Sequence, residues 1–270
     1  MKRIEILSVV ASFLTARGSP SPAGPTSSPV PEPTPPLIGK QSTIDALSEL
    51  YGNLKLPAYL TEGGTRQREG EFDANETFSV LSHTSMEPGY VLDYVYFFEF
   101  SGGEPLLYAR PVDQAPYLTY AEFDAATGIT ISSPQRDGYL EHVRVDGTGE
   151  GFFELALFHL MGDQFYLFWH AGYNDDTAVC DRAGLEAIVS DLEDSEFGLP
   201  LSAEQAQQAR ALDLAPVVEF EDDTVTVRFV SFTKWGGFFQ QTYVFAREFP
   251  HQLIRHDATE LVPYDCGILF

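Results

Sequence analysis

The chain has 270 residues, of which 44% are hydrophobic, enough to bury a sizeable core. Asp and Glu number 40 against 16 Lys and Arg, so the formal net charge is −24. A field of this sign repels phosphate backbones and anionic lipid surfaces, which excludes nucleic acid and charge-driven membrane binding from the expected functions. Proteins, cations and neutral small ligands such as carbohydrate remain as partners, and we expect a monomer. A plain acidic, well-solvated surface is the simpler explanation of the charge.

Residues 1–17 have the outline of a secretory signal. A basic start precedes an apolar run, 6–14, that is too short for a membrane-spanning helix. Segment 14–19, Leu-Thr-Ala-Arg-Gly-Ser, resembles the lipobox of bacterial lipoprotein signals at every position except Arg17, which stands where the lipidated cysteine would be. The resemblance implies an extracytoplasmic protein, secreted or associated with a bacterial cell envelope. Either the chain descends from a lipoprotein and has lost its anchor, or the cysteine was changed in this copy; a chance cytosolic N-terminus is the alternative.

A proline-rich linker follows at residues 18–36. It holds eight of the chain's 18 prolines among Ser, Thr, Gly and Ala, a composition that cannot build a core. In polyproline II conformation its 19 residues would span up to roughly 60 Å, as a tether does. We therefore place a single globular domain at 37–270, and a helix-then-strands order that occurs twice suggests two α+β halves, 37–180 and 181–270.

The first part of that domain predicts one helix and then a series of strands. Ser42 and Asp45 form a capping-box pattern, and apolar residues follow at helical spacing until Gly52. Alternating apolar segments separated by Gly-containing turns predict antiparallel strands. The predicted strands are 76–84, 90–100, 104–110 and 139–145, with a short helix at 119–127 before the last of them.

The densest apolar run extends from Gly151 to Asp181. Its two apolar segments, 152–160 and 165–171, flank Met-Gly-Asp-Gln, so we predict a central β-hairpin covered on both faces. In that register His159 and His170 would lie roughly 13 Å apart, too far to share one metal ion. The glycine-rich stretch before the run carries two acidic residues and has no clear helix after it, so it is not expected to bind phosphate.

The C-terminal part predicts two helices and a second set of strands. One helix begins after Asp181, and the other has a capping box at Ser202 and Gln205. The strands expected after them are 217–221, 224–233, 238–247, 252–256 and 259–262. The whole pattern predicts an α+β fold, mainly antiparallel sheet in meanders and hairpins, with three or four short helices.

Two groups of residues are candidate sites. Asn174, Asp175 and Asp176 at the exit of the apolar run offer oxygen ligands for a calcium-type ion, although such residues more often stabilise turns. The ligand-binding candidates are His170 and Tyr173 in the same segment and Trp235 in a glycine-rich turn, where an exposed ring could face a partner or a sugar. A tryptophan folded back on the core is the alternative for Trp235.

Catalytic residues cannot be identified from the sequence. The six histidines show no short paired spacing of zinc enzymes, and no Gly-x-Ser-x-Gly elbow is present. We therefore expect a non-catalytic accessory or binding module for a protein or neutral ligand, with no cofactor. The alternative is an extracytoplasmic hydrolase or calcium-dependent enzyme with its site near His170 to Asp181.

The chain has two cysteines, Cys180 and Cys266. In an exported domain they could form a disulfide that fastens the C-terminus to the start of the helix after Asp181. Two buried free thiols are an equally weighted alternative.

Overall fold

The computed structural model describes residues 40–194 and 198–268, so the predicted signal and linker, 1–17 and 18–36, lie outside the described residues. Its α-helices are α1 (Lys40–Gly52), α2 (Ala58–Gly63), α3 (Tyr120–Thr127), α4 (Gly149–Met161), α5 (Arg182–Asp194) and α6 (Ala203–Arg210). Its 3-10 helices are η1 (Ala74–Ser79), η2 (Pro134–His142) and η3 (His170–Tyr173). None of the helices in these ranges is long and apolar enough to cross a membrane.

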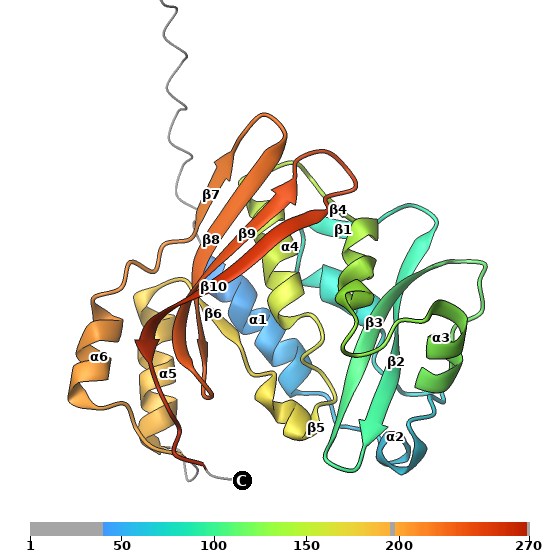
Figure 1. Cartoon of the computed structure of the whole chain (residues 1–270), viewed down its shortest axis with the longest axis horizontal. Coiled ribbons are helices and arrows are strands. Elements are labelled where there is room, and N and C mark those ends of the chain that lie inside the picture. The colour runs from blue at the N-terminus through green and yellow to red at the C-terminus, as the bar shows by residue number, and fades with distance from the viewer. Residues whose placement is uncertain (1–39, 195–197, 269–270) are drawn as a thin grey trace, which may run out of the picture. The chain divides into compact units, whose positions relative to one another are not determined.

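The strands form three antiparallel sheets (Figure 1). The largest has the order β10-β9-β8-β6, with β7 also paired to β8. The others are the pair β1-β4 and the three-stranded β2-β3-β5. The strands are β1 (Thr84–Met86), β2 (Tyr90–Glu99), β3 (Gly102–Pro111), β4 (Val143–Val145), β5 (Phe168–Trp169), β6 (Thr177–Val179), β7 (Val217–Phe220), β8 (Thr224–Thr233), β9 (Gly237–Ala246) and β10 (Leu253–Pro263). The predicted α+β fold with mainly antiparallel sheet is confirmed, with more helices than expected.

Helices α3, α5 and α6 have a local capping signal and lie where the sequence predicted them. Thr119 accepts from the backbone N–H of Glu122, and Asp181 accepts from that of Gly184. Ser202 and Gln205 form the expected reciprocal capping box of α6. The cap satisfies backbone groups that the helix itself leaves unpaired, so its signal survives without tertiary information.

The predicted central hairpin is wrong, because segment 152–160 forms α4 instead. Thr148 caps this helix through Gly151, and ten of its thirteen residues are buried. A helix that is apolar on every side shows no 3.6-residue periodicity, so it resembles a buried strand in sequence. The 13 Å separation between His159 and His170 rested on the hairpin register and has no basis in this fold.

Residues 146–148 of the glycine-rich stretch link β4 to α4, and residues 149–151 form the first turn of that helix, so the expectation that no helix follows is wrong. The carboxylate of Asp146 nevertheless lies at the N-terminus of α4, where a phosphate would have to bind. Asp146 accepts from both the backbone N–H and the hydroxyl of Thr148, at 3.0 and 2.6 Å. The loop thus satisfies its own donors with an internal negative charge, which is unfavourable for phosphate.

Three other strand predictions need correction. In segment 76–84, residues 76–79 belong to η1, whose cap is Asp73, and residues 80–83 form turns before β1 begins at Thr84; segment 139–145 is the end of η2 followed by the short β4. The two short strands expected at 252–262 are one continuous strand, β10. Helix α1 begins at Lys40, before the predicted cap Ser42. Short stretches of this kind carry too few residues for periodicity to separate 3-10 turns from strands.

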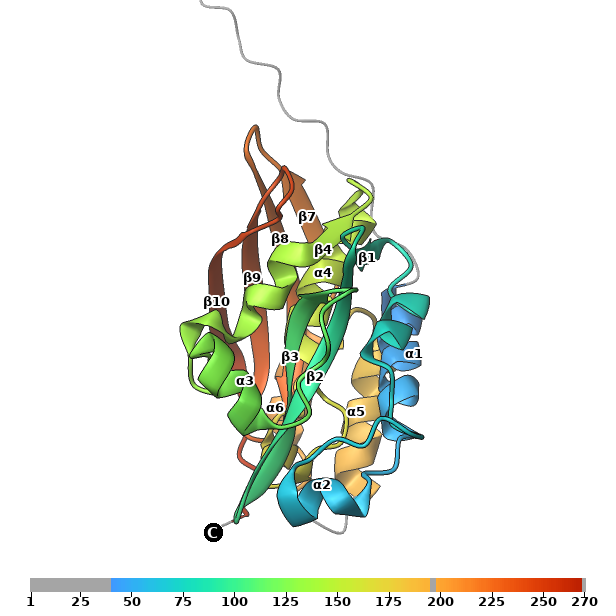
Figure 2. The ribbon, with the colours of Figure 1, turned by 90° about the vertical axis from the view of Figure 1, so that its right-hand side faces the viewer.

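The largest core packs α1 and α4 against one face of the sheet that contains β8 and β9 (Figures 1 and 2). Phe153 of α4 is fully buried and meets Phe229 edge to face, with ring centroids 5.6 Å apart. A second core lies under α5 and α6, and a small third cluster lies between α3 and β2-β3. The apolar run identified in the sequence is therefore central, although as a helix.

Candidate functional site

The turn between β2 and β3 is held against the segment that follows α4. Strand β5 pairs with β3 through Gly102 and Gly103, and the backbone N–H of His170 donates to the carbonyl of Ser101 at 2.9 Å. A Cβ on Gly102 would lie 3.2 Å from the backbone nitrogen of Ala171, closer than usual for such contacts. This close approach fixes the backbone from which Trp169 projects.

Trp169 is a large aromatic side chain turned outward. The residue is 63% exposed, and its backbone adopts φ 47°, the left-handed region that non-glycine residues rarely occupy. The indole stacks on the His170 ring with centroids 5.3 Å apart and an interplanar angle of 9°. Phe100, in the turn beside it, is 94% exposed. Strained conformations persist where surrounding structure enforces them, commonly at functional positions.

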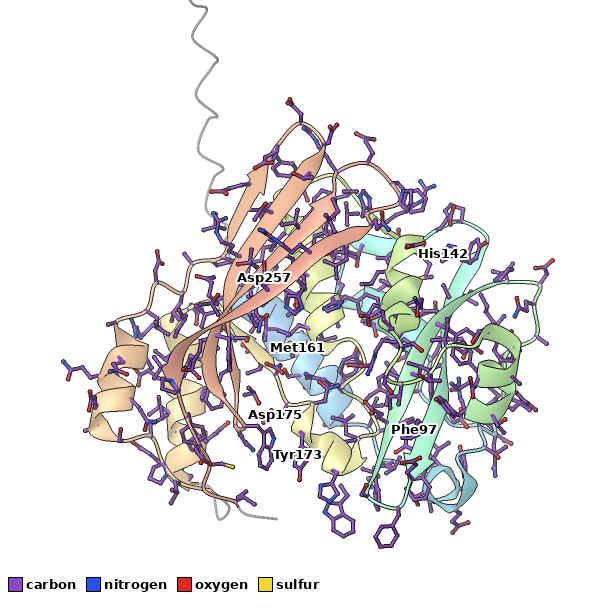
Figure 3. The ribbon with its side chains drawn as sticks, viewed as in Figure 1. Phe97, His142, Met161, Tyr173, Asp175 and Asp257 are labelled. Atoms are coloured by element: carbon purple, nitrogen blue, oxygen red, sulfur yellow. The ribbon has the colours of Figure 1, made fainter. Side chains whose placement is uncertain are left out.

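The three predicted ligand-binding residues lie together beside Trp169. The His170 Nδ1 and Tyr173 hydroxyl are 2.6 Å apart, and the Tyr173 and Trp235 rings meet at 4.4 Å between centroids. Figure 3 shows Tyr173 next to Asp175 at the end of the molecule where this cluster lies. We call Phe100, Trp169, His170, Tyr173 and Trp235 the aromatic corner. It joins the β2-β3 turn, η3 and the β8-β9 turn.

The predicted calcium ligands point to different partners. Asp175 accepts from the hydroxyl of Thr233 and from the backbone N–H of Lys234, so it ties the β8-β9 turn to η3. Asn174 donates to Asp163 at 2.9 Å, on another side of the segment. Within the described ranges, no group of three or more His, Cys, Asp or Glu side chains is placed to hold a metal ion. Asp176 is the unusual member, because burial and the charge of Asp175 raise its pKa to about 6.

A polar cluster that the sequence did not predict lies between α4 and the large sheet. His159 Nε2 is 3.4 Å from Asp137, and His159 Nδ1 is 3.3 Å from the Tyr243 hydroxyl. His256 stacks on Tyr243 with centroids 4.2 Å apart and meets the ring of His159 at 5.3 Å. Two histidines far apart in sequence thus come together through the packing of β10 and α4.

The hydrogen bonds of this cluster define the protonation of His256. Gln241 donates its amide N–H to Ser231, so its carbonyl oxygen must accept from His256 Nε2 at 2.8 Å. Desolvation of the inner side of the ring and the neighbouring His159 lower the pKa of His256 to about 4, although the residue as a whole is solvent-exposed. At neutral pH the imidazole is therefore uncharged, with Nδ1 as an acceptor.

A third polar group is a buried ion-pair cluster around Asp93. Arg66, Arg68 and Arg110 all contact its carboxylate, at 2.6, 2.7 and 2.8 Å, and Arg66 also pairs with Glu71 at 2.6 Å. The cluster borders a cavity of about 310 Å³. Burial opposes ionisation, but the hydrogen bonds from Arg68 and Arg110 and the charge of Arg66 lower the pKa of Asp93. Each of the three guanidinium groups is paired with Asp93, so we assign the cluster a structural role, although the buried Arg68 Nε has no hydrogen-bond partner among the described residues.

Cys180 and Cys266 are free thiols in the structure, which does not contain the disulfide considered above. Cys180 packs against the largest core and Cys266 belongs to the second, so the two thiols face different interiors. Burial raises the pKa of the Cys180 thiol to about 12.

Comparison with protein-family models, with curated proteins and with solved structures gave no match to this chain. The aromatic corner therefore has to be interpreted from its own geometry.

Proposed function

We propose that this chain is a non-catalytic binding module that acts outside the cytoplasm and holds a neutral ligand of the carbohydrate class on the aromatic corner. The observation that carries the proposal is Trp169, which is 63% exposed on a left-handed backbone. Burial of a tryptophan stabilises a fold, whereas exposure and backbone strain both cost free energy. A side chain that incurs both costs serves a contact with another molecule.

The form of the corner suits a flat, uncharged ring. The Trp169 indole lies nearly parallel to the His170 ring, with centroids 5.3 Å apart, and the high exposure of Trp169 leaves indole surface to a ligand. Phe100 adds a second exposed apolar ring on the adjoining turn. An aromatic face accommodates the C–H side of a sugar, and the net charge of −24 imposes no penalty on a neutral chain.

The extracytoplasmic part of the proposal rests on the signal-like residues 1–17 and the proline-rich linker at 18–36. Processing after about residue 16 is expected in an expressing bacterium. Restoration of the lipobox by Arg17→Cys should make the product membrane-anchored and labelled by palmitate. An unlabelled Arg17→Cys protein would remove the lipoprotein resemblance as support.

The experiment for the binding function is affinity electrophoresis in native gels that contain a neutral soluble polysaccharide, with a panel of β-glucan, xylan and mannan. The wild type should be retarded by at least one of them. Trp169→Ala and Phe100→Ala should each weaken the affinity by about tenfold or more. The matched control is Val112→Ala, which removes a side chain that is 60% exposed elsewhere on the surface.

If no neutral polysaccharide retards the wild type, the carbohydrate class is wrong and a protein becomes the expected partner of the corner. If Val112→Ala weakens binding as much as Trp169→Ala, the corner is not the site.

A second candidate is a hydrolase, and one observation favours it. The carboxyl of Asp176 has its pKa raised to about 6 and acts on the pKa of Tyr243, whose ring stacks on the neutral His256, an arrangement that provides an acid and a base around Tyr243. Turnover of a chromogenic glycoside or ester panel that is lost in Asp176→Asn but kept in Trp169→Ala would favour the enzyme. Calcium and chelators that leave the melting temperature unchanged would remove the calcium-dependent form of this candidate.

A further inference from the structure

Strand β10 is an edge strand with an unusual degree of exposure. It pairs with β9 on one side, and no strand in the described part of the chain pairs with its other side. All eight residues from Ile254 to Leu261 are exposed, on both faces of the sheet. Such an edge presents a row of N–H and C=O groups that can pair with another strand. Sheet edges of this length are usually covered, which indicates that another strand pairs with β10.

The exposed stretch is regular enough to extend the sheet. Shifts in the pairing with β9 occur only near its ends, between Leu253 and Arg255 and between Glu260 and Val262. From Arg255 to Glu260 each residue pairs in sequence with one residue of β9. Bulges interrupt pairing where they occur, so their positions define a straight segment between them.

Two copies of this strand can meet only in certain registers. A two-fold axis normal to the sheet keeps each side chain on its own face, so every residue lies opposite a partner residue of the same odd or even parity. One residue therefore faces its own copy at the axis. The choice among registers then depends on which charges lie opposite one another.

With His256 at the axis, opposite charges meet. Arg255 lies opposite the partner's Asp257, and the symmetric pair forms on the other side. Arg255 and Asp257 already pair within one strand at 3.0 Å, with side chains 62% and 55% exposed. The two strands would thus place four charges of alternating sign on one face. On the other face Ala258 comes opposite the partner's Ile254, which is 56% exposed and lies in the bulge between Leu253 and Arg255, so the regular pairing extends from Arg255 to Asp257.

Neighbouring registers are less favourable. With Asp257 at the axis two carboxylates face each other, and with Arg255 at the axis two guanidinium groups do, which is destabilising. With Ala258 at the axis Arg255 lies opposite the partner's Leu261 and forms no cross-strand ion pair. His256 itself tolerates the axis, because its ring is turned toward Gln241 and Tyr243 of its own sheet.

In place of the monomer expected from the sequence, we infer that two copies of this chain associate through antiparallel pairing of β10 about a two-fold axis at His256, which joins the two large sheets into one. The inference is independent of the proposed ligand. Because one strand pair buries less surface than a standard stable interface, we expect dimerisation at micromolar concentrations.

The charges provide the first test, by sedimentation velocity over a range of protein concentrations. Arg255→Asp and Asp257→Arg each place like charges opposite one another, so each should raise the dissociation constant of the dimer about tenfold or more. The double variant Arg255→Asp/Asp257→Arg exchanges the charges and should recover the dimer. Both sites are exposed, so circular dichroism should show the wild-type fold in each variant.

The register provides the second test, by oxidative cross-linking. His256→Cys should form a covalent dimer, whereas Ala258→Cys should not, because the two introduced thiols would lie about 13 Å apart along the strands. The wild type, with its Cys180 and Cys266, supplies the background.

A wild type that remains monomeric at about 0.2 mM overturns the inference. So does a double variant that fails to recover the dimer while remaining folded. Cross-linking of Ala258→Cys in place of His256→Cys overturns the proposed register.

Discussion

Two parts of one apolar run, 151–181, lie in opposite environments. The first forms α4, in which Phe153 is fully buried against the sheet. The second begins with the buried Phe165 and Tyr166 and then leads to the aromatic corner, in which Trp169 is 63% exposed. Their composition is similar, so apolar content alone did not separate core from surface. The two parts differ in backbone conformation. The first is a capped, regular helix, whereas Trp169 in the second has a left-handed backbone that is held by the β2-β3 turn.

We expect side-chain truncation in the two parts to affect stability very differently. Phe153→Ala removes a fully buried ring and leaves a cavity, which should lower the free energy of unfolding by about 3–5 kcal/mol. Urea denaturation monitored by circular dichroism measures this directly. A loss below about 1 kcal/mol would mean that α4 is not the centre of the core.

The Asp93 cluster should contribute to the stability of the fold as a buried core residue does, although it is charged. Asp93→Asn removes the charge that pairs with three guanidinium groups, so it should lower the free energy of unfolding by about 3 kcal/mol. Chemical denaturation of the variant beside Asp73→Asn, a cap at the same cavity, provides the measurement and its control. Equal small losses in both variants would contradict the structural role.

The same cluster predicts a pH dependence. Despite burial, the arginine contacts give Asp93 a lower pKa in the folded than in the unfolded state, so the unfolded chain binds more protons in acid. Its contribution is complete above the unfolded value of about 3.9 and is lost as the pH falls through the folded pKa. Unfolding followed from neutral to acidic pH should show this loss in the wild type and a smaller one in Asp93→Asn.

Asp176 should make a contribution to the pH dependence of stability that is opposite in sign to that of Asp93. Burial and Asp175 raise its folded pKa to about 6, so the folded state binds the proton more tightly and stability falls as the pH rises from about 4 to 6. Asp176→Asn should therefore stabilise the protein by about 1 kcal/mol near neutral pH. The gain should vanish below about pH 4, where the wild-type carboxyl is protonated in both states. An equal gain in the exposed control Asp191→Asn would mean that relief of net negative charge is the cause.

Local signals predicted the capped helices, because Thr119, Asp181 and Ser202 act within one turn of chain. The long strands β2, β8 and β9 were predicted within one or two residues for the same reason, since alternation is a local pattern. Helix α4 was missed because burial on all sides erases the periodic signal that distinguishes a helix from a strand.

The candidate site also contains residues that local sequence signals identified and residues that only the tertiary structure brings together. His170, Tyr173 and Trp235 were selected from their positions in turns, and the structure places their rings in contact. Trp169 lies in the same candidate segment but was not among the predicted ligand-binding residues, because its left-handed backbone depends on pairing with Gly102. The pair His159 and His256 was unpredictable, since only the packing of β10 beside α4 brings them together.

The most direct test of the account measures Trp169→Ala twice, by urea denaturation and by affinity electrophoresis against the polysaccharide that retards the wild type. Because the ring makes little buried contact, we predict a change in the free energy of unfolding within about 0.5 kcal/mol. The same variant should lose affinity by about tenfold or more. Unchanged affinity, or a loss of stability comparable to that of Phe153→Ala, would contradict the claim that Trp169 belongs to a binding surface and not to the core.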